Sequence, residues 1–328
     1  MNDRPPTSRD VARRAGVSQS AVSRAFTPGA SISPEMRERI ECAAADLNYR
    51  PNLLPGMMLK GRTGIIAVVV GGFYNPFYAM TLEAFTRALT AAGRQIMLIQ
   101  IESDRALDDA VGRLAGYRVD GVVSALSVQS QPVAEALSAY RVPIVTLNSA
   151  VETEWVRSVR SDNRAAGMQA ARLLHARGGT RFAYVAGPLD SISQVERGIG
   201  FREALAALGL PAPLELPGDY HHAGGLAAGR ALLSQGSPPD AIFCANDLTA
   251  LGVIDALRAG GRSCPADFRI IGYDNIEAAS WPGYALATFD QRVDEMVAMA
   301  VAMLCDPPGG DAIRTVQPLL VDRVSAGG

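Results

Sequence analysis

A short stretch near the N-terminus gathers side chains that can hydrogen-bond to the edges of DNA bases. They are three serines, one glutamine and one arginine: Ser18, Gln19, Ser20, Ser23 and Arg24. Glutamine can pair through two hydrogen bonds with adenine and arginine with guanine, while serine can bond to a base or to a phosphate. The competing interpretation is a small helical hairpin with a solvated polar face. The concentration of these residue types among small side chains favours DNA recognition.

Two short helices are predicted to position these side chains. The apolar residues of the first recur at helical spacing: Val11, Ala12 and Ala15. Gly16 then ends this helix, because glycine tolerates the positive φ of a helix terminus. Ser18 is the N-cap of the second helix, residues 19–26. Two helices joined by a turn containing glycine are typical of a helix-turn-helix, in which the second helix enters the major groove.

A third helix is predicted over residues 34–47, with Ser33 as N-cap and Pro34 at its first position. The motifs in this region are Asp10-Val11-Ala12, Ala15-Gly16-Val17-Ser18, Val22-Ser23-Arg24 and Leu47-Asn48-Tyr49-Arg50-Pro51-Asn52. Through these motifs, the stretch from residue 7 to residue 52 resembles the DNA-binding headpiece of the LacI/GalR family of repressors. The resemblance implies further DNA contacts by Thr7 and Asn52.

Residues 52–63 read as a linker. In the resembled family this stretch forms a hinge helix on DNA, and a leucine from each subunit enters the minor groove. Met58 occupies that leucine's position here, and methionine is an acceptable apolar wedge. Pro55-Gly56 departs from the family pattern and favours a shorter or weaker hinge helix. The alternative is that Met57 and Met58 pack on the body.

Composition is that of a globular protein. The chain has 328 residues, 48% of them hydrophobic, and a net charge of −2. Residues 1–63 hold ten basic and six acidic residues, so the N-terminal part is basic on an otherwise acidic chain. Long apolar runs are missing and the first residues are polar, which predicts neither a transmembrane helix nor a signal peptide. The four scattered cysteines are expected to be free thiols in a reducing cytoplasm.

From residue 64 onward, short β-branched runs alternate with helical patterns, and the rhythm restarts after residue 161. This alternation predicts parallel sheets covered by helices on both faces. The predicted fold class is therefore an all-α helix-turn-helix headpiece joined to an α/β body of two doubly wound parallel-sheet lobes, which the resemblance makes periplasmic-binding-protein-like. The predicted domains are a headpiece at 1–51, a hinge at 52–63 and an effector-binding and dimerisation domain at 64–328. Its lobes are expected at about 64–161 and 162–287, with later crossovers.

Loops at the predicted carboxyl ends of strands, where ligands bind in open parallel sheets, combine hydrogen-bonding groups with aromatic residues. That mixture suits a sugar-like ligand. The family resemblance implies ten effector contacts: Asn75, Phe77, Asn148, Ser193, Arg197, Tyr220, Asn246, Asp247, Asp274 and Gln291. Structural roles are the alternatives for three of them. In these alternatives the sole role of Asp247 is to cap the helix that follows, Asp274 belongs to a turn, and Arg197 is a structural cation.

Patterns for catalysis or metal binding are weak. The three histidines form no ligand cluster, and Gly198-Ile199-Gly200 lacks the third glycine of a dinucleotide turn. We therefore predict no catalytic residue, no metal and no cofactor. A sugar-processing enzyme on the same body would need Asp247 and Asp274 as a carboxylate pair. A solute-binding protein for transport would need an export signal, which the sequence does not carry.

Together these features predict a cytoplasmic, homodimeric repressor that makes no contact with a membrane. Its partners are expected to be a palindromic double-stranded DNA operator, because two headpieces meet two half-sites, and a small-molecule effector. A sugar or sugar acid fits the predicted clamp residues best, and a nucleobase is the second possibility because the resembled family includes purine-responsive members.

Overall fold

The computed structural model describes residues 4–27, 29–51, 62–101, 114, 116–128, 130–305 and 311–328. The chain divides into two compact units, Met1–Thr63 and Gly64–Gly328. The linker prediction, including Pro55-Gly56 and Met58, falls outside the described residues.

The N-terminal unit is a three-helix bundle made of α1 (Ser8–Ala15), α2 (Gln19–Ala25) and α3 (Pro34–Asp46). Gly16 adopts the left-handed conformation (φ 64°) after α1, as predicted. The core is built from small and β-branched side chains: Val11, Ala12, Ala15, Ala21, Val22, Ala25, Ile40, Ala43 and Ala44. Because these side chains are short, the helices approach closely, and the polar face of α2 stays outside the core.

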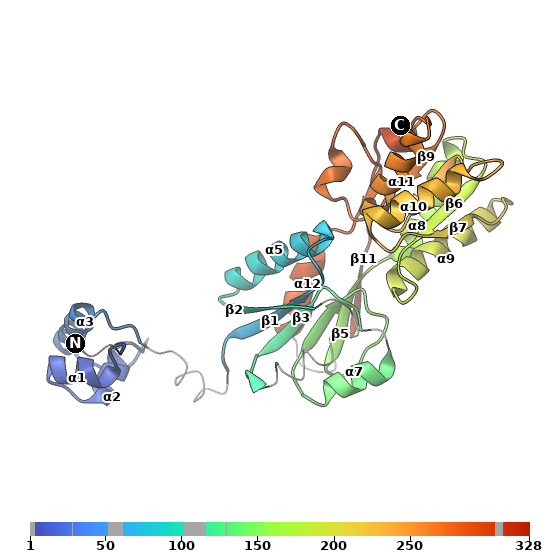
Figure 1. Ribbon diagram of the computed structural model, residues 1–328. Helices are drawn as coiled ribbons and strands as arrows, with labels where there is room; N and C mark the ends of the chain where they lie inside the picture. Colours follow the sequence, from blue (N-terminus) through green and yellow to red (C-terminus); the bar gives the residue numbers. More distant parts are fainter. Residues whose placement is uncertain are drawn as a thin grey trace. The chain divides into compact units, whose positions relative to one another are not determined.

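The first lobe of the body is a six-stranded parallel sheet with the strand order β11-β5-β4-β3-β1-β2 (Figure 1). Its strands are β1 (Ile65–Val70), β2 (Gln95–Gln100), β3 (Gly121–Ser124), β4 (Ile144–Leu147), β5 (Val156–Ser161) and β11 (Ile313–Val316). Helices α5 (Pro76–Ala91) and α12 (Val293–Cys305) cover one face, and α7 (Gln131–Ser138) covers the other. Both faces are buried, which explains why β1 and β4 are almost entirely apolar.

The second lobe is a four-stranded parallel sheet with the order β7-β6-β8-β9. Its strands are β6 (Phe182–Ala186), β7 (Leu214–Pro217), β8 (Ala241–Cys244) and β9 (Arg269–Ile271). Helices α8 (Asn163–Ala176) and α9 (Ile192–Ala207) pack on one face, and α10 (His222–Leu233) and α11 (Asp247–Ala259) on the other. The two layered parallel sheets and the helical headpiece confirm the predicted fold class.

The chain passes between the lobes more than once. β5 leads directly into α8, and β10 (Thr288–Asp290) leads back to α12 in the first lobe. After β11, β12 (Leu319–Val321) pairs antiparallel with β10. The sequence patterns did not predict β5 and β11 as strands, because arginines and hydroxyl side chains interrupt their apolar positions.

Two glycines let α8 and α9 cross at backbone contact. A Cβ atom on Gly167 would lie 2.0 Å from the carbonyl oxygen of Arg197, and one on Gly200 would lie 2.0 Å from that of Arg164. No side chain fits at either position without moving a helix. This close crossing fixes the position of the Arg197 backbone relative to α8.

The substitution Gly167→Ala should therefore lower the free energy of unfolding of the body by about 1–3 kcal/mol, the usual range for overpacking. Denaturant unfolding followed by circular dichroism measures this change. Gly236→Ala is the matched control, because a Cβ atom there meets nothing within 4 Å. Equal unfolding midpoints for the two variants would contradict the close helix crossing.

Candidate functional site

The exposed face of α2 carries the side chains predicted to meet DNA. Ser18, Gln19, Ser20, Ser23 and Arg24 are all exposed, while Ala21, Val22 and Ala25 on the same helix are buried. The hydroxyl of Ser18 accepts a hydrogen bond from the backbone N–H of Ala21 at 3.2 Å, so it caps α2 as predicted. Five polar side chains thus stand together at one helix and its N-terminus, the arrangement that a recognition helix needs.

The start of α1 supports the polar face of α2. The Asp10 carboxylate accepts hydrogen bonds from the Thr7 backbone N–H (2.9 Å) and hydroxyl (2.6 Å), and these bonds lower the pKa of Asp10. The Gln19 side-chain amide donates to the Ser8 hydroxyl at 2.8 Å, which links α2 to α1. The start of α1 is therefore held against the start of α2. Two other predicted DNA contacts, Asn52 and Met58, lie outside the described residues.

In the body, a cavity of about 290 Å³ opens between the lobes. The first lobe lines it with residues that follow β1, β3 and β4: Gly71, Gly72, Tyr74, Asn75, Phe77, Tyr78, Ala125, Leu126, Ser127, Leu147 and Asn148. The second lobe and the returning chain add Pro188, Asp190, Ser191, Ser193, Arg197, Tyr220, Asp274 and Gln291. The volume is close to the lower end of ligand pockets, roughly 300 Å³. Eight of the ten predicted effector residues line this cavity.

Two residues with positive φ angles take part in a hydrogen-bonded connection between the lobes at the cavity. Asn148 and Asp274 have positive φ angles of 60° and 113°, conformations that are uncommon for side-chain-bearing residues and concentrate at functional sites. The side-chain amide of Asn148 donates to Gln291 Oε1 at 3.3 Å, and Gln291 Nε2 donates to Asp274 Oδ1 at 2.7 Å. One hydrogen-bonded chain therefore runs from the first lobe through the returning chain to the second.

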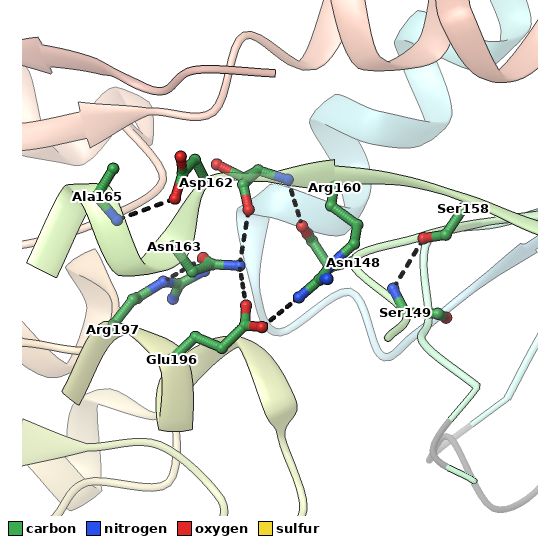
Figure 2. A network of polar contacts seen from close by, with 10 residues as sticks. Asn148, Ser149, Ser158, Arg160, Asp162, Asn163, Ala165, Glu196 and Arg197 are labelled. Atoms are coloured by element: carbon green, nitrogen blue, oxygen red, sulfur yellow. Dashed lines mark hydrogen bonds and ion pairs between the residues drawn. The ribbon is translucent and has the colours of Figure 1, made fainter. Parts of the chain in front are cut away.

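Arg197 is 3% exposed and is held from three sides. Its Nε donates to Asn163 Oδ1 at 2.8 Å, its Nη1 donates to the Ala245 carbonyl, and its guanidinium lies 3.5 Å from the centre of the Tyr273 ring. Figure 2 shows Asn163 between Arg197 and the Glu196 side chain, which also pairs with Arg160. The structure therefore gives Arg197 a supporting network in addition to its place at the cavity.

Burial raises the pKa of Asp274 to about 6, although the nearby Arg197 guanidinium and the hydrogen bond from Gln291 both act to lower it. Asp274 as a whole residue is 4% exposed, so its charged form has lost most of its water. A ligand hydroxyl that donates to this carboxylate would replace some of that lost solvation. Asp274 is therefore suited to a binding role near neutral pH.

Asn246 and Asp247 are placed outside the cavity lining. The Asn246 side chain accepts from the Thr249 backbone N–H at 3.0 Å and donates to the Tyr220 carbonyl at 3.1 Å. Asp247 accepts from the Thr288 hydroxyl at 2.6 Å and from the Ile276 backbone N–H at 2.9 Å, and burial raises its pKa well above the usual value. Asn246, not Asp247, caps α11. Both residues hold the loops that carry Tyr220 and Asp274.

Several cavity residues were not singled out from the sequence. Tyr74, Tyr78, Asp190 and Ser191 belong to loops that were recognised as polar and aromatic, but no spacing distinguished them within those loops. The segment after β3, residues 125–127, was missed altogether. Its position past the carboxyl end of a buried parallel strand was the available signal.

Two further features are absent from the part of the chain that the structure describes. No helix in this part is long and apolar enough to cross a membrane. Within the same ranges, no group of three or more histidine, cysteine, aspartate or glutamate side chains is arranged to hold a metal ion.

Comparison with known families gives two matches. Residues 7–52 match the family described as bacterial regulatory proteins of the lacI family. Residues 63–300 match the periplasmic binding proteins and sugar binding domain of the LacI family.

Individual proteins agree with these matches over nearly the whole chain. The ribose operon repressor of Escherichia coli strain K12 is 32% identical over 98% of this chain and 99% of its own. The HTH-type transcriptional regulator CelR of Thermobifida fusca is 34% identical over 97% and 96%. Among solved structures, the lac repressor dimer bound to operator and the anti-inducer ONPF aligns with a TM-score of 0.88 at 26% identity, covering 98% and 99%.

A helix-turn-helix unit joined to a two-lobed body with a polar cavity between the lobes defines a DNA-binding transcriptional regulator with a small-molecule site. The family matches cover both units of the chain. The protein belongs to the LacI family of bacterial regulatory proteins.

The affinity for an effector that donates a hydroxyl to Asp274 should rise with pH between about 5 and 7. The pKa of this carboxyl is about 6, so below pH 6 most of the ligand-free protein carries a proton on Asp274. That proton must leave before a ligand hydroxyl can donate to the carboxylate. Affinity should therefore fall by up to about tenfold for each pH unit below 6. Because the pKa of Asp274 is raised in the folded body, its protonation adds to the free energy of unfolding in acid. This contribution is lost as the pH rises through 6. Calorimetric titration with a bound sugar from pH 5 to pH 8 measures the affinity.

Asp274→Asn should weaken binding at pH 7.5 and flatten the pH profile. Glu135→Gln removes an exposed carboxylate from α7 and should leave the profile unchanged. An unaltered pH profile in Asp274→Asn would rule out Asp274 as the titrating group.

Proposed function

We propose that this protein is a cytoplasmic, homodimeric repressor of genes for carbohydrate use, and that a sugar in the cavity between its lobes controls its binding to a palindromic operator. One observation carries the proposal: a single chain combines an exposed polar face on the second helix of a helix-turn-helix with a polar cavity built from both lobes. The names of its relatives support it, since they include a ribose operon repressor and a lac repressor bound to operator as a dimer.

The DNA contacts in this proposal come from Ser18, Gln19, Ser20, Ser23 and Arg24 on the α2 face, with Thr7 at the start of α1. Asn52 and Met58 complete the set from outside the described residues. The division of labour follows the predicted domains, with the headpiece at 1–51, the hinge at 52–63 and the body at 64–328. Two headpieces in a dimer would meet two half-sites, so the operator is expected to be a palindrome.

The charge of the cavity favours a neutral sugar over a sugar acid. Three charged side chains line it, Asp190, Asp274 and Arg197. Two of the five N–H groups of Arg197 already bond to Asn163 and Ala245, so an anionic ligand would meet two carboxylates and one cation whose donors are partly in use. Asn75, Asn148 and Gln291 offer neutral partners for hydroxyl groups, and the Phe77 and Tyr220 rings offer apolar surface.

The carboxylate pair that the sequence offered for catalysis, Asp247 with Asp274, is not brought together in the cavity. A glycosidase would need two carboxyl groups on either side of the scissile bond. The Asp247 side chain lies outside the cavity and both of its oxygens accept hydrogen bonds from Thr288 and Ile276. It therefore cannot work across a bound sugar with Asp274, and we propose a regulator without enzymatic activity.

Selection of bound sequences from random DNA with the full-length protein should yield a palindrome. Gln19→Ala should bind the same operator about 5- to 150-fold more weakly and lose preference at one base pair in each half-site, because a two-pronged pair with adenine contributes about 1–3 kcal/mol. Selection at a fixed salt concentration makes the comparison valid. Glu38→Ala on the exposed face of α3 serves as the control for folding of the headpiece. The absence of any enriched sequence would refute the regulator proposal.

A panel of neutral sugars and their acid counterparts tests the effector class. D-Ribose, D-xylose, D-glucose and D-galactose should include at least one that raises Tm and changes operator affinity, while the matching aldonic acids should do neither. Asp190→Asn should improve binding of the acid counterpart, because it removes one of the two repelling carboxylates. Preferential binding of an acid by the unaltered protein would contradict the charge argument.

A further inference from the structure

Two aromatic rings, one from each lobe, stack on each other at the cavity. The ring centres of Tyr74 and His221 are 4.1 Å apart and the ring planes are inclined by 20°. Tyr74 comes from the loop after β1 and lines the cavity, whereas His221 directly precedes α10 in the second lobe. Both side chains are exposed, Tyr74 by 52%, so the pair lies where the cavity meets solvent.

The second-lobe side of the stack is held in an unusual backbone conformation. Asp219 and Tyr220 both have positive φ angles, 53° and 60°, which non-glycine residues rarely adopt in succession. The loop is fixed by a bond from Asn246 to the Tyr220 carbonyl and by a contact of 2.8 Å between the Tyr220 and Ser191 hydroxyls. This turn sends the Tyr220 side chain to the cavity and the His221 ring to Tyr74.

One glycine makes room for the Tyr74 ring, and another makes room for the Tyr220 ring next to His221. A Cβ atom on Gly72 would lie 2.7 Å from the Tyr74 ring, and one on Gly187 would lie 2.4 Å from the Tyr220 ring. The rings of Tyr74 and Tyr220 therefore lie directly on backbone. This packing holds Tyr74 in the first lobe and the residue that precedes His221 in the second.

We propose that Tyr74 and His221 form an aromatic latch that closes the cavity and limits the effector to a single sugar ring. The limit on size rests on the proposed sugar-binding function; the closure does not. A one-ring ligand fits a cavity of about 290 Å³ with the latch shut. A second ring joined through a glycosidic bond and extending toward Tyr74 would meet the stacked rings.

Closure can be measured without knowing the effector. Ser193 is 8% exposed and lines the cavity, so Ser193→Cys places a thiol behind the latch. The rate at which iodoacetamide modifies this thiol, followed by mass spectrometry of the peptide, reports how often the cavity opens. In the Ser193→Cys background, His221→Ala should raise this rate about two- to tenfold, the equivalent of losing one aromatic stack.

Controls separate the latch from a general loosening of the fold. His222→Ala removes the neighbouring imidazole, which bonds to Asp255 within the second lobe, and should leave the rate unchanged. His221→Phe keeps a flat ring and should restore slow labelling. Tyr74→Ala should raise the rate by a similar factor, with no further rise when it is combined with His221→Ala. Equal rates in His221→Ala and its parent, or additive effects of the two alanines, would overturn the latch.

Sugar binding then tests the limit on size. The protein with an intact latch should show a rise in Tm with a monosaccharide from the panel but none with cellobiose, and His221→Ala should gain a response to cellobiose. Cellobiose binding by the unaltered protein would refute the size limit. Faster labelling of His221→Ala without binding of any sugar would leave the closure intact and refute the proposed function. Sugar binding with an unchanged labelling rate in His221→Ala would refute the closure and leave the proposed function intact.

Discussion

The burial of one guanidinium, that of Arg197, is the constraint on which the effector side of the molecule depends. A buried cation is strongly destabilising unless hydrogen bonds or charges compensate it. Asn163, the Ala245 carbonyl and the face of Tyr273 supply that compensation, and each comes from a different segment of the second lobe. The close crossing of α8 and α9 at Gly167 places the arginine within reach of all three. Replacing any of these partners would disturb the cavity as well as the lobe.

The same network reaches the connection between the lobes. Asn163 accepts from Arg197 and also donates to the Ser161 carbonyl at 3.1 Å, at the point where β5 passes into α8. Glu196, next to Arg197 in the chain, pairs with Arg160 on β5. A ligand that alters the position of Arg197 therefore acts on groups that join the two lobes. A ligand shifts a conformation only through different contacts in its two states, and this network offers such contacts at the connection between the lobes.

Much of this architecture could be predicted from residue patterns. The features that were not predicted have identifiable physical causes. The headpiece helices followed from small apolar residues at helical spacing and from Ser18 and Gly16 at their ends. Strand β5 escaped because Arg157 is 3% exposed inside a strand whose pattern looks polar. Eight predicted effector residues line the cavity, but Asn246 and Asp247 sit behind it, because a motif fixes a residue's identity and not the direction of its side chain. The contact between Tyr74 and His221 joins positions far apart in sequence, which no local pattern encodes.

The return of the chain to the first lobe has a consequence for biosynthesis. Helix α12 covers part of one face of the six-stranded sheet and β11 adds its outer strand beside β5, yet both are translated after the four strands of the second-lobe sheet. The strands of the second-lobe sheet, β6 to β9, follow one another in sequence and can pair as soon as they leave the ribosome, whereas the first-lobe sheet waits for α12 and β11 with a partly uncovered apolar face and an unpaired edge. Such surfaces invite aggregation, so the nascent first lobe is exposed to it for longer than the second-lobe sheet.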